Sequence, residues 1–227
     1  MASTRQTFQQ QLDAVEQELQ HHGRLVLRAL DRAMQALLAG DEQLADLVIA
    51  EDDENDASYL RIEDEVERLL ALQTPLATDL RLILAILHIN LHLERMGDQC
   101  VNIAKLTKLT LGLVIASELL ESFRKMGEQA EAMTADAMTA FAERDIERAE
   151  RLVIMDAVIN GENRELARRI MALGGDERMR EAGLRAILIS RCMERIGDNA
   201  VDIGERVAYL ASGEFREFTD ASHHPGE

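Results

Sequence analysis

The chain has 227 residues, of which 47% are hydrophobic but only 3% aromatic, and it contains 2 prolines and no tryptophan. This composition predicts an all-helical protein, because strong helix formers dominate and residues that interrupt helices are rare. The net charge of −17 argues against nucleic acid as a partner and favours cations or basic partners, since nucleic-acid phosphates require a basic face.

The N-terminal residues and the longest apolar stretch argue against export and membrane insertion. Residues 1–20 are polar, so we expect no signal peptide. Residues 80–93 are too short for a transmembrane segment and are interrupted by Arg81, His88 and His92. We expect Cys100 and Cys192 to be buried thiols in a reducing compartment. The sequence therefore predicts a cytoplasmic protein, and attachment to the inner face of the membrane through partners stays open.

Hydrophobic periodicity predicts three long helices in the first half, over residues 5–39, 41–72 and 75–111. The first helix carries one apolar stripe, made of Leu12, Val15, Leu19, Val26, Leu30, Ala33 and Leu37.

Local signals mark the ends of these helices. We expect Gly40 to end the first helix and Asp41 to cap the second. Thr74 is the predicted N-cap of the third, with Pro75 at its first helical position. Gly112 is the predicted end of the third helix.

The same pattern recurs in the second half. We expect a fourth helix over 114–143, a fifth that Asp145 opens and Gly174-Gly175 closes, and a sixth that Asp176 caps and that ends near Leu210. The sequence therefore predicts two tandem, similar three-helix bundles, residues 1–112 and 113–227, six long antiparallel helices in all. We expect the end of the second bundle, around residues 222–226, to be a short disordered tail.

A five-residue motif occurs in the third helix and again in the sixth. Glu94-Arg95-Met96-Gly97-Asp98 recurs 100 positions later as Glu194-Arg195-Ile196-Gly197-Asp198. Residues four apart share one face of a helix, so each copy places two carboxylates side by side. Because like charges repel, each pair favours a cation between or beside its members.

Helical phase places these carboxylates near an apolar stripe. Leu84, Leu87 and Leu91 lead into Glu94 and Asp98 within about 80° around the helix. Asn102 follows one turn later. In the sixth helix, Leu184 and Ile187 lead into Glu194, Asp198 and Asp202. Carboxylates beside a buried seam lose hydration, which is costly unless they are paired or bound to metal.

The second and fifth helices supply further oxygen ligands. Asp52 and Asp56 are again four apart, and their equivalents at an offset of 104 are Asp156 and Asn160. Such oxygen ligands suit Mg, Mn or Fe. The candidate metal ligands are Asp52, Asp56, Glu94, Asp98 and Asn102 in the first half, and Asp156, Asn160, Glu194, Asp198 and Asp202 in the second.

Other interpretations of these residues stay open. The acids can be ordinary surface ion pairs, and His88 and His92, whose repeat equivalents are Leu188 and Cys192, are better explained as non-ligands. Gly97 and Gly197 interrupt helices at equivalent positions, which indicates that a ligand or another backbone approaches closely there. The alternative is ordinary packing of one helix on another.

Taken together, the motifs resemble the PhoU family over nearly the whole chain, about residues 8–215. The resemblance rests on Gln73-Thr74-Pro75-Leu76-Ala77-Thr78-Asp79-Leu80-Arg81 and on the two copies of the five-residue motif. It implies two similar three-helix bundles and metal clusters of iron or zinc, or of magnesium or manganese, held by acidic pairs. Asn160 departs from the carboxylate pattern of that family.

The resemblance also implies a function. Members of the family act as negative regulators of the phosphate-starvation response. They are thought to link the ATPase subunit of the phosphate ABC transporter to a sensor histidine kinase, and homodimers are common. We therefore expect a metal-binding regulatory adaptor and not an enzyme. The alternatives are a metal-dependent enzyme with a carboxylate site and a metal-free helical scaffold.

Overall fold

The computed structural model describes residues 2–72, 75–172, 177–214 and 216–218. Its helices are α1 (Ala2–Ala39), α2 (Glu42–Ala50), α3 (Asp52–Leu72), α4 (Ala77–Thr110), α5 (Ser117–Glu143), α6 (Ile146–Ala172) and α7 (Glu177–Ser212). These described ranges contain no strand, so the prediction of an all-α fold is confirmed. None of their helices combines the length and the apolarity that crossing a bilayer requires.

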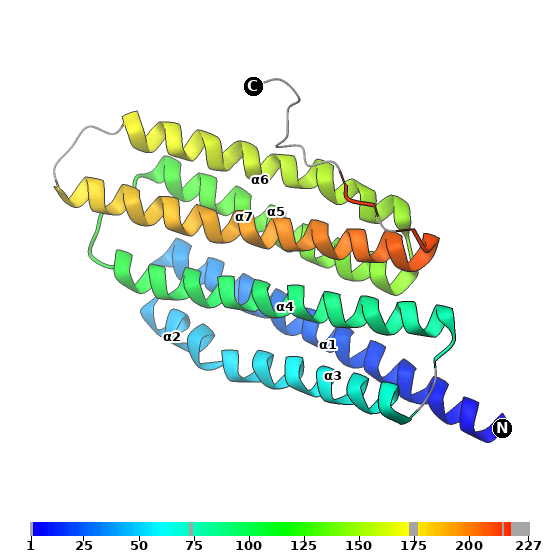
Figure 1. Cartoon of the computed structure of the whole chain (residues 1–227). Helices are drawn as coiled ribbons and strands as arrows, with labels where there is room; N and C mark the ends of the chain where they lie inside the picture. Colours follow the sequence, from blue (N-terminus) through cyan, green and yellow to red (C-terminus); the bar gives the residue numbers. More distant parts are fainter. Residues whose placement is uncertain (1, 73–74, 173–176, 215, 219–227) are drawn as a thin grey trace.

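The helices form two bundles that lie side by side (Figure 1). Helices α1, α3 and α4 pack on one another, as do α5, α6 and α7. The two bundles meet where α4 lies along α7 and α1 contacts α5. Two similar three-helix bundles are therefore confirmed, while the boundary after residue 112 stays a prediction.

The prediction of one continuous helix over residues 41–72 is wrong, because the chain breaks at Glu51 into two helices, α2 and α3. Four consecutive acids, residues 51–54, would repel one another inside one continuous helix. Starting a new helix at Asp52 places three of them in its first turn, where the helix dipole favours negative charge. The corresponding residues 155–158 contain one acid, and α6 runs through them without a break.

Most of the predicted helix ends agree with the structure. Gly40 and Gly112 adopt positive φ angles of 64° and 78° just after α1 and α4. The carboxylates of Asp41 and Asp145 accept hydrogen bonds of 3.0 Å from Leu44 N and Arg148 N. Thr74, Gly174, Gly175, Asp176 and the tail at 222–226 lie outside the described residues.

Two predicted starts need correction. Leu76 is the N-cap of α4, with ψ of 163°, so Pro75 precedes the cap instead of occupying the first helical position. The extended Leu76 thus separates Pro75 from the first turn of the helix. Helix α5 begins at Ser117, later than residue 114, after an extended N-cap at Ala116.

The predicted apolar stripe of α1 is confirmed, since all seven of its residues are buried. The predicted stripe of α4 is wrong: Leu84 is 37% exposed, whereas Ile83, Ile86 and Ile89 are completely buried. Helix α4 contacts α1 and α3 as well as α7, so residues on several of its faces are apolar and more than one stripe fits the helical period. In α7, Leu184 is likewise 60% exposed.

The two bundles make reciprocal contacts across α1 and α5. Gly23 of α1 lies against Met138 of α5, and Gly127 of α5 lies against Met34 of α1. Met138 and Gly127 are the repeat equivalents of Met34 and Gly23 at an offset of 104. The duplicated halves are therefore related by an approximate two-fold axis between these helices.

A buried polar chain ties three helices of the first bundle together. Asn90 of α4 donates to the carbonyl oxygen of Tyr59 in α3 at 3.0 Å. Its amide oxygen lies 2.8 Å from Nδ1 of His22 in α1, so that nitrogen carries the proton. His22 is fully buried, and burial lowers its pKa to about 4. In the second bundle the equivalent residue is Met126.

The burial of His22 predicts a loss of stability in mild acid. Between its unfolded pKa near 6.5 and its folded pKa of about 4, the unfolded chain binds the extra proton, so stability falls as the pH falls. From about pH 7.5 to about pH 5 this contributes a loss of roughly 2 kcal/mol in the free energy of unfolding. Urea unfolding of wild type and His22→Met at both pH values measures it. The variant should lose that part of the pH dependence, whereas the control His21→Gln should retain it.

Candidate metal centre

Helices α3 and α4 bring the four predicted carboxylates of the first half together. Burial raises the pKa of Asp52, and the Asp56 and Asp98 carboxylates raise it further, while Lys105 lowers it. Burial also raises the pKa of Glu94, followed by the charges of Asp98, Asp56 and Asp52. Asp52 and Glu94 are half-buried. The four groups therefore form one cluster of mutually repelling charges that a cation would stabilise.

Asn55 lies where α3 meets α4, a role that the sequence analysis missed. Its amide nitrogen is 2.7 Å from the point at which a Cβ would stand on Gly97. Asn55 is 6% exposed, and its amide oxygen has no hydrogen-bond donor among the described residues. A buried oxygen of this kind, near Asp52 and against the glycine of the carboxylate motif in α4, fits the ligand preference of a hard cation. Asn55 follows Asp52 by three residues, a spacing that places both side chains on one face of a helix, and this spacing could have identified it from the sequence.

The glycines of the repeated motif serve helix packing. Gly97 admits the Asn55 side chain, and Gly197 admits a carboxylate oxygen of Asp156, which lies 2.7 Å from the position of an added Cβ. Side chains of the neighbouring helix make both close approaches. Of the two alternatives that the sequence left open, the described residues therefore favour helix packing.

The second half arranges its predicted ligands differently. Asp156 and Asn160 are buried on α6, and the Asn160 amide donates to Asp156 Oδ2 at 2.5 Å. Glu194 instead accepts a 2.9 Å hydrogen bond from Asn163 and a short one from Arg191. Amide and guanidinium groups thus donate hydrogen bonds to the carboxylates here, whereas in the first half the charges of Lys105 and Arg95 only partly offset the repulsion among the carboxylates.

The remaining predicted ligands face other directions. Asn102 lines a groove between α4 and α7. Asp202 lies 3.5 Å from Nδ1 of His92, across the same pair of helices, and Asp198 is exposed. Across the described ranges, no three His, Cys, Asp or Glu side chains are arranged to enclose a metal ion. Binding an ion would therefore require the carboxylates of either half to rotate toward one another.

His92 and both cysteines are buried, whereas His88 is exposed. His92 is bonded to the Asn199 amide oxygen at 2.8 Å, joining α4 to α7. Burial lowers the pKa of both His88 and His92. Cys100 and Cys192 are buried free thiols, as predicted, and burial raises the pKa of each.

Comparison with known families and proteins agrees with this architecture. A family model described as the PhoU domain matches residues 19–107 and again residues 123–207. A phosphate-specific transport system accessory protein PhoU homolog of Clostridium acetobutylicum is 29% identical over 219 residues, covering 96% of this chain and 100% of the relative. The homolog of Pseudomonas aeruginosa is 32% identical over 222 residues, covering 96% of this chain and 88% of the relative.

Two solved structures have the same fold. The crystal structure of PhoU from Pseudomonas aeruginosa matches with a TM-score of 0.84 and 32% identity, covering 91% of this chain and 100% of that one. The crystal structure of the phosphate transport system regulatory protein PhoU from Streptococcus pneumoniae matches with a TM-score of 0.84 and 32% identity, covering 92% of this chain and 99% of that one.

The contact between Gly97 and Asn55 predicts that Gly97→Ala is destabilising. The new methyl group would force the Asn55 amide away, at a cost of about 1–3 kcal/mol that outweighs the better helix propensity of alanine. Gly161→Ala, which meets nothing within 4 Å, is the matched control and should gain up to about 1 kcal/mol. Chemical denaturation measures both. Adding Asn55→Ala to Gly97→Ala should recover part of the loss; strictly additive effects would contradict the contact.

Proposed function

The chain belongs to the PhoU domain family, and from this membership we propose that it is an accessory, regulatory protein of phosphate uptake. The names of its relatives in Clostridium acetobutylicum and Pseudomonas aeruginosa support this function, because the alignments span nearly the whole length of each protein. Those relatives are named as accessory proteins, which favours a regulatory role over a catalytic one.

The proposed regulatory role is that of an adaptor and negative regulator. In this proposal the protein represses the phosphate-starvation response when phosphate is abundant. It connects the ATPase subunit of the phosphate ABC transporter to a sensor histidine kinase, at the cytoplasmic face of the membrane and as a homodimer. The family membership supports this role, and the strongly acidic helical surface suits contact with basic partner segments.

The first bundle is the proposed metal site. Asp52 and Asp56 of α3, with Glu94 and Asp98 of α4, would hold Fe, Zn, Mn or Mg, and the Asn55 oxygen is a further ligand. The observation that carries this proposal is the gathering of these four carboxylates where α3 meets α4; burial, and after it the neighbouring carboxylate charges, raises the pKa of both Asp52 and Glu94. A bound cation would supply the missing positive charge and cross-link α3 to α4.

The second bundle is proposed to bind metal more weakly. Asn160 already donates a hydrogen bond to Asp156, and Asn163 and Arg191 donate to Glu194. Glu194 and the Oδ2 atom of Asp156 already accept hydrogen bonds from protein donors, so a cation would gain less there than in the first bundle. The metal-free scaffold thus describes the second half better than the first.

Metal binding is tested by elemental analysis of the purified protein. Wild type should retain metal, and Glu94→Gln/Asp98→Asn should lose most of it because two of the four charges are gone. The matched variant Glu194→Gln/Asp198→Asn should change the metal content little. Equal, negligible metal in wild type and in both variants would favour the scaffold.

Thermal unfolding gives an independent test of the same site. Chelation should lower the midpoint of wild type by several degrees, since binding to the folded state stabilises it. Chelation should not affect Glu94→Gln/Asp98→Asn. The metal-free variant should also be more stable than metal-free wild type, because part of the carboxylate repulsion is removed. A midpoint of wild type that does not respond to chelation would argue against a structural metal.

Deleting the gene in its host tests the regulatory role. Phosphate-responsive genes should become active in high phosphate, and wild type supplied in trans should restore their repression. Glu94→Gln/Asp98→Asn should restore it incompletely if the metal supports the adaptor. Transcript levels measure the outcome. Full repression in the deletion strain would show that the protein is not a negative regulator.

A further inference from the structure

A groove of about 490 Å³ lies between the C-terminal half of α4 and the middle of α7. Lys105 of α4 and Arg191 and Arg195 of α7 line it, together with the amides of Gln99 and Asn102. No carboxylate is among its lining residues. In a chain with a net charge of −17, three cations around one groove stand out from the surrounding surface.

Two of the three cations are available to a ligand. Arg191 forms an ion pair with Glu194. Lys105 and Arg195 form no direct ion pair within the part of the chain that the structure describes, although the charge of Lys105 reaches Asp52 and lowers the pKa of that carboxyl. Both side chains are exposed along the groove. An incoming anion would therefore not have to break a direct ion pair of either side chain.

Gln99 adds a buried polar group to the wall of this groove. It is 9% exposed, and its amide oxygen has no hydrogen-bond donor among the described residues. A carboxamide can turn over and present its N–H donors at the same place. Such a group, beside Lys105 and Arg195, suits a ligand whose oxygens accept hydrogen bonds.

The approximate symmetry of the molecule provides an internal comparison. At an offset of 100, the equivalents of Lys105, Asn102 and Arg191 are Glu205, Asp202 and Leu91. Two carboxylates and one leucine thus replace two cations and one amide at the other end of the α4–α7 contact. Glu205 also accepts a 2.7 Å hydrogen bond from the backbone of Phe218, so the chain itself occupies that carboxylate.

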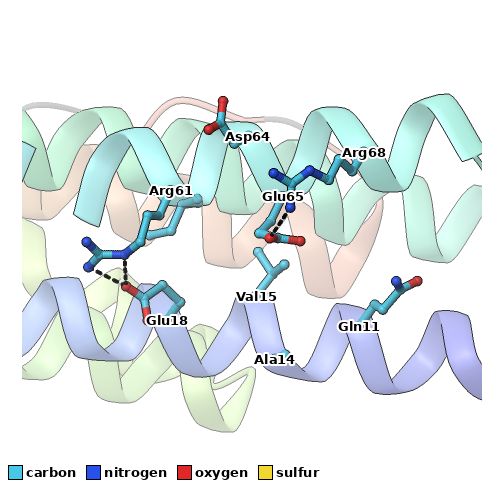
Figure 2. Close-up of a pocket in the computed structure, with 9 residues that line it drawn as sticks. Gln11, Ala14, Val15, Glu18, Arg61, Asp64, Glu65 and Arg68 are labelled. Atoms are coloured by element: carbon cyan, nitrogen blue, oxygen red, sulfur yellow. Dashed lines mark hydrogen bonds and ion pairs between the residues drawn. The ribbon is translucent and has the colours of Figure 1, made fainter. Parts of the chain in front are cut away.

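A cleft between α1 and α3 shows how the chain neutralises cations elsewhere (Figure 2). Arg61 of α3 reaches across to Glu18 of α1, and its Nη2 donates at 2.8 Å. Arg68 donates to Glu65 on its own helix at 2.7 Å. Each arginine there donates directly to a carboxylate, whereas Lys105 and Arg195 of the α4–α7 groove form no direct ion pair in the described chain.

We propose that the α4–α7 groove binds a phosphate-type oxyanion through Lys105, Arg191 and Arg195, with Gln99 and Asn102 as neutral donors. Two guanidinium groups and an ammonium group together suit a tetrahedral anion with two negative charges better than they suit a carboxylate, which carries only one. The apolar side chains of Leu106 and Leu188 form the rest of the wall and leave room for an organic group. The anion is free inorganic phosphate or the phosphate of a small phosphorylated molecule.

This inference goes beyond the regulatory role and does not depend on it, because binding is a property of the isolated protein. Isothermal titration of the full-length protein with inorganic phosphate, with ADP and with sulfate, at low ionic strength, measures it. Phosphate or ADP should bind, with affinity that falls as salt is added. Tighter binding of ADP would identify the organic phosphate as the preferred source. Failure of both to bind would overturn the proposal.

Variants assign the binding to this groove. Lys105→Gln and Arg195→Gln should each weaken it by about tenfold or more, as expected for losing a charge-assisted contact. Lys105→Glu, which copies the residue at position 205, should abolish it. Arg95→Gln changes the repeat equivalent of Arg195 and should leave binding unchanged. Equal binding by wild type and Lys105→Glu would place the anion elsewhere and reject the groove.

Chelation separates this site from the proposed metal centre. A phosphate held by a metal ion in the first bundle would be lost when the ion is removed. Anion binding at the groove should survive chelation and should survive Glu94→Gln/Asp98→Asn. Binding that disappears with the metal would overturn the assignment to the groove, whatever the outcome for the regulatory role.

Discussion

The close approach of two helices at a glycine sets the geometry on which both candidate centres depend. At Gly97 the side chain of Asn55 fills the space that a methyl group would take, and at Gly197 the carboxylate of Asp156 does so. Because the helices come this near, acidic side chains on their adjoining faces are close enough to repel one another strongly. The same small residue that makes the packing tight therefore also concentrates the negative charge.

Duplication gave the chain two copies of this contact, and they now differ in how the charge is compensated. In the first half, Asp52 and Glu94 are partly buried among other carboxylates. In the second half, Asn160 replaces a carboxylate and hydrogen-bonds to Asp156. The break between α2 and α3 belongs to the same divergence, since the acids that would repel within a helix occur only in the first copy. A similar backbone thus supports one charged centre and one that is internally hydrogen-bonded.

The sequence predicted features that depend on neighbours along the chain, such as the cap at Asp41 and the termination at Gly40. The four-residue spacing of Asp52 and Asp56, the same as that of Glu94 and Asp98, also predicted that the two pairs would come together. Features that depend on which face of a helix packs against which neighbouring helix could not be predicted from the sequence. Helix α4 offers two apolar stripes, so periodicity selected Leu84 where packing selects Ile83. Asp202 faces His92, because α7 runs antiparallel to α4, and no local pattern encodes that pairing.

The reciprocal contacts of Gly23 with Met138 and of Gly127 with Met34 have a further meaning. They are the contacts of an isologous dimer interface, here formed within a single polypeptide. In a dimer of identical chains, any change in one groove appears in the other as well. Covalent fusion removes that restriction, so Lys105 and Glu205 can occupy equivalent places with opposite charge. The molecule can thereby keep the stability of a symmetric interface while presenting two unlike surfaces to its surroundings.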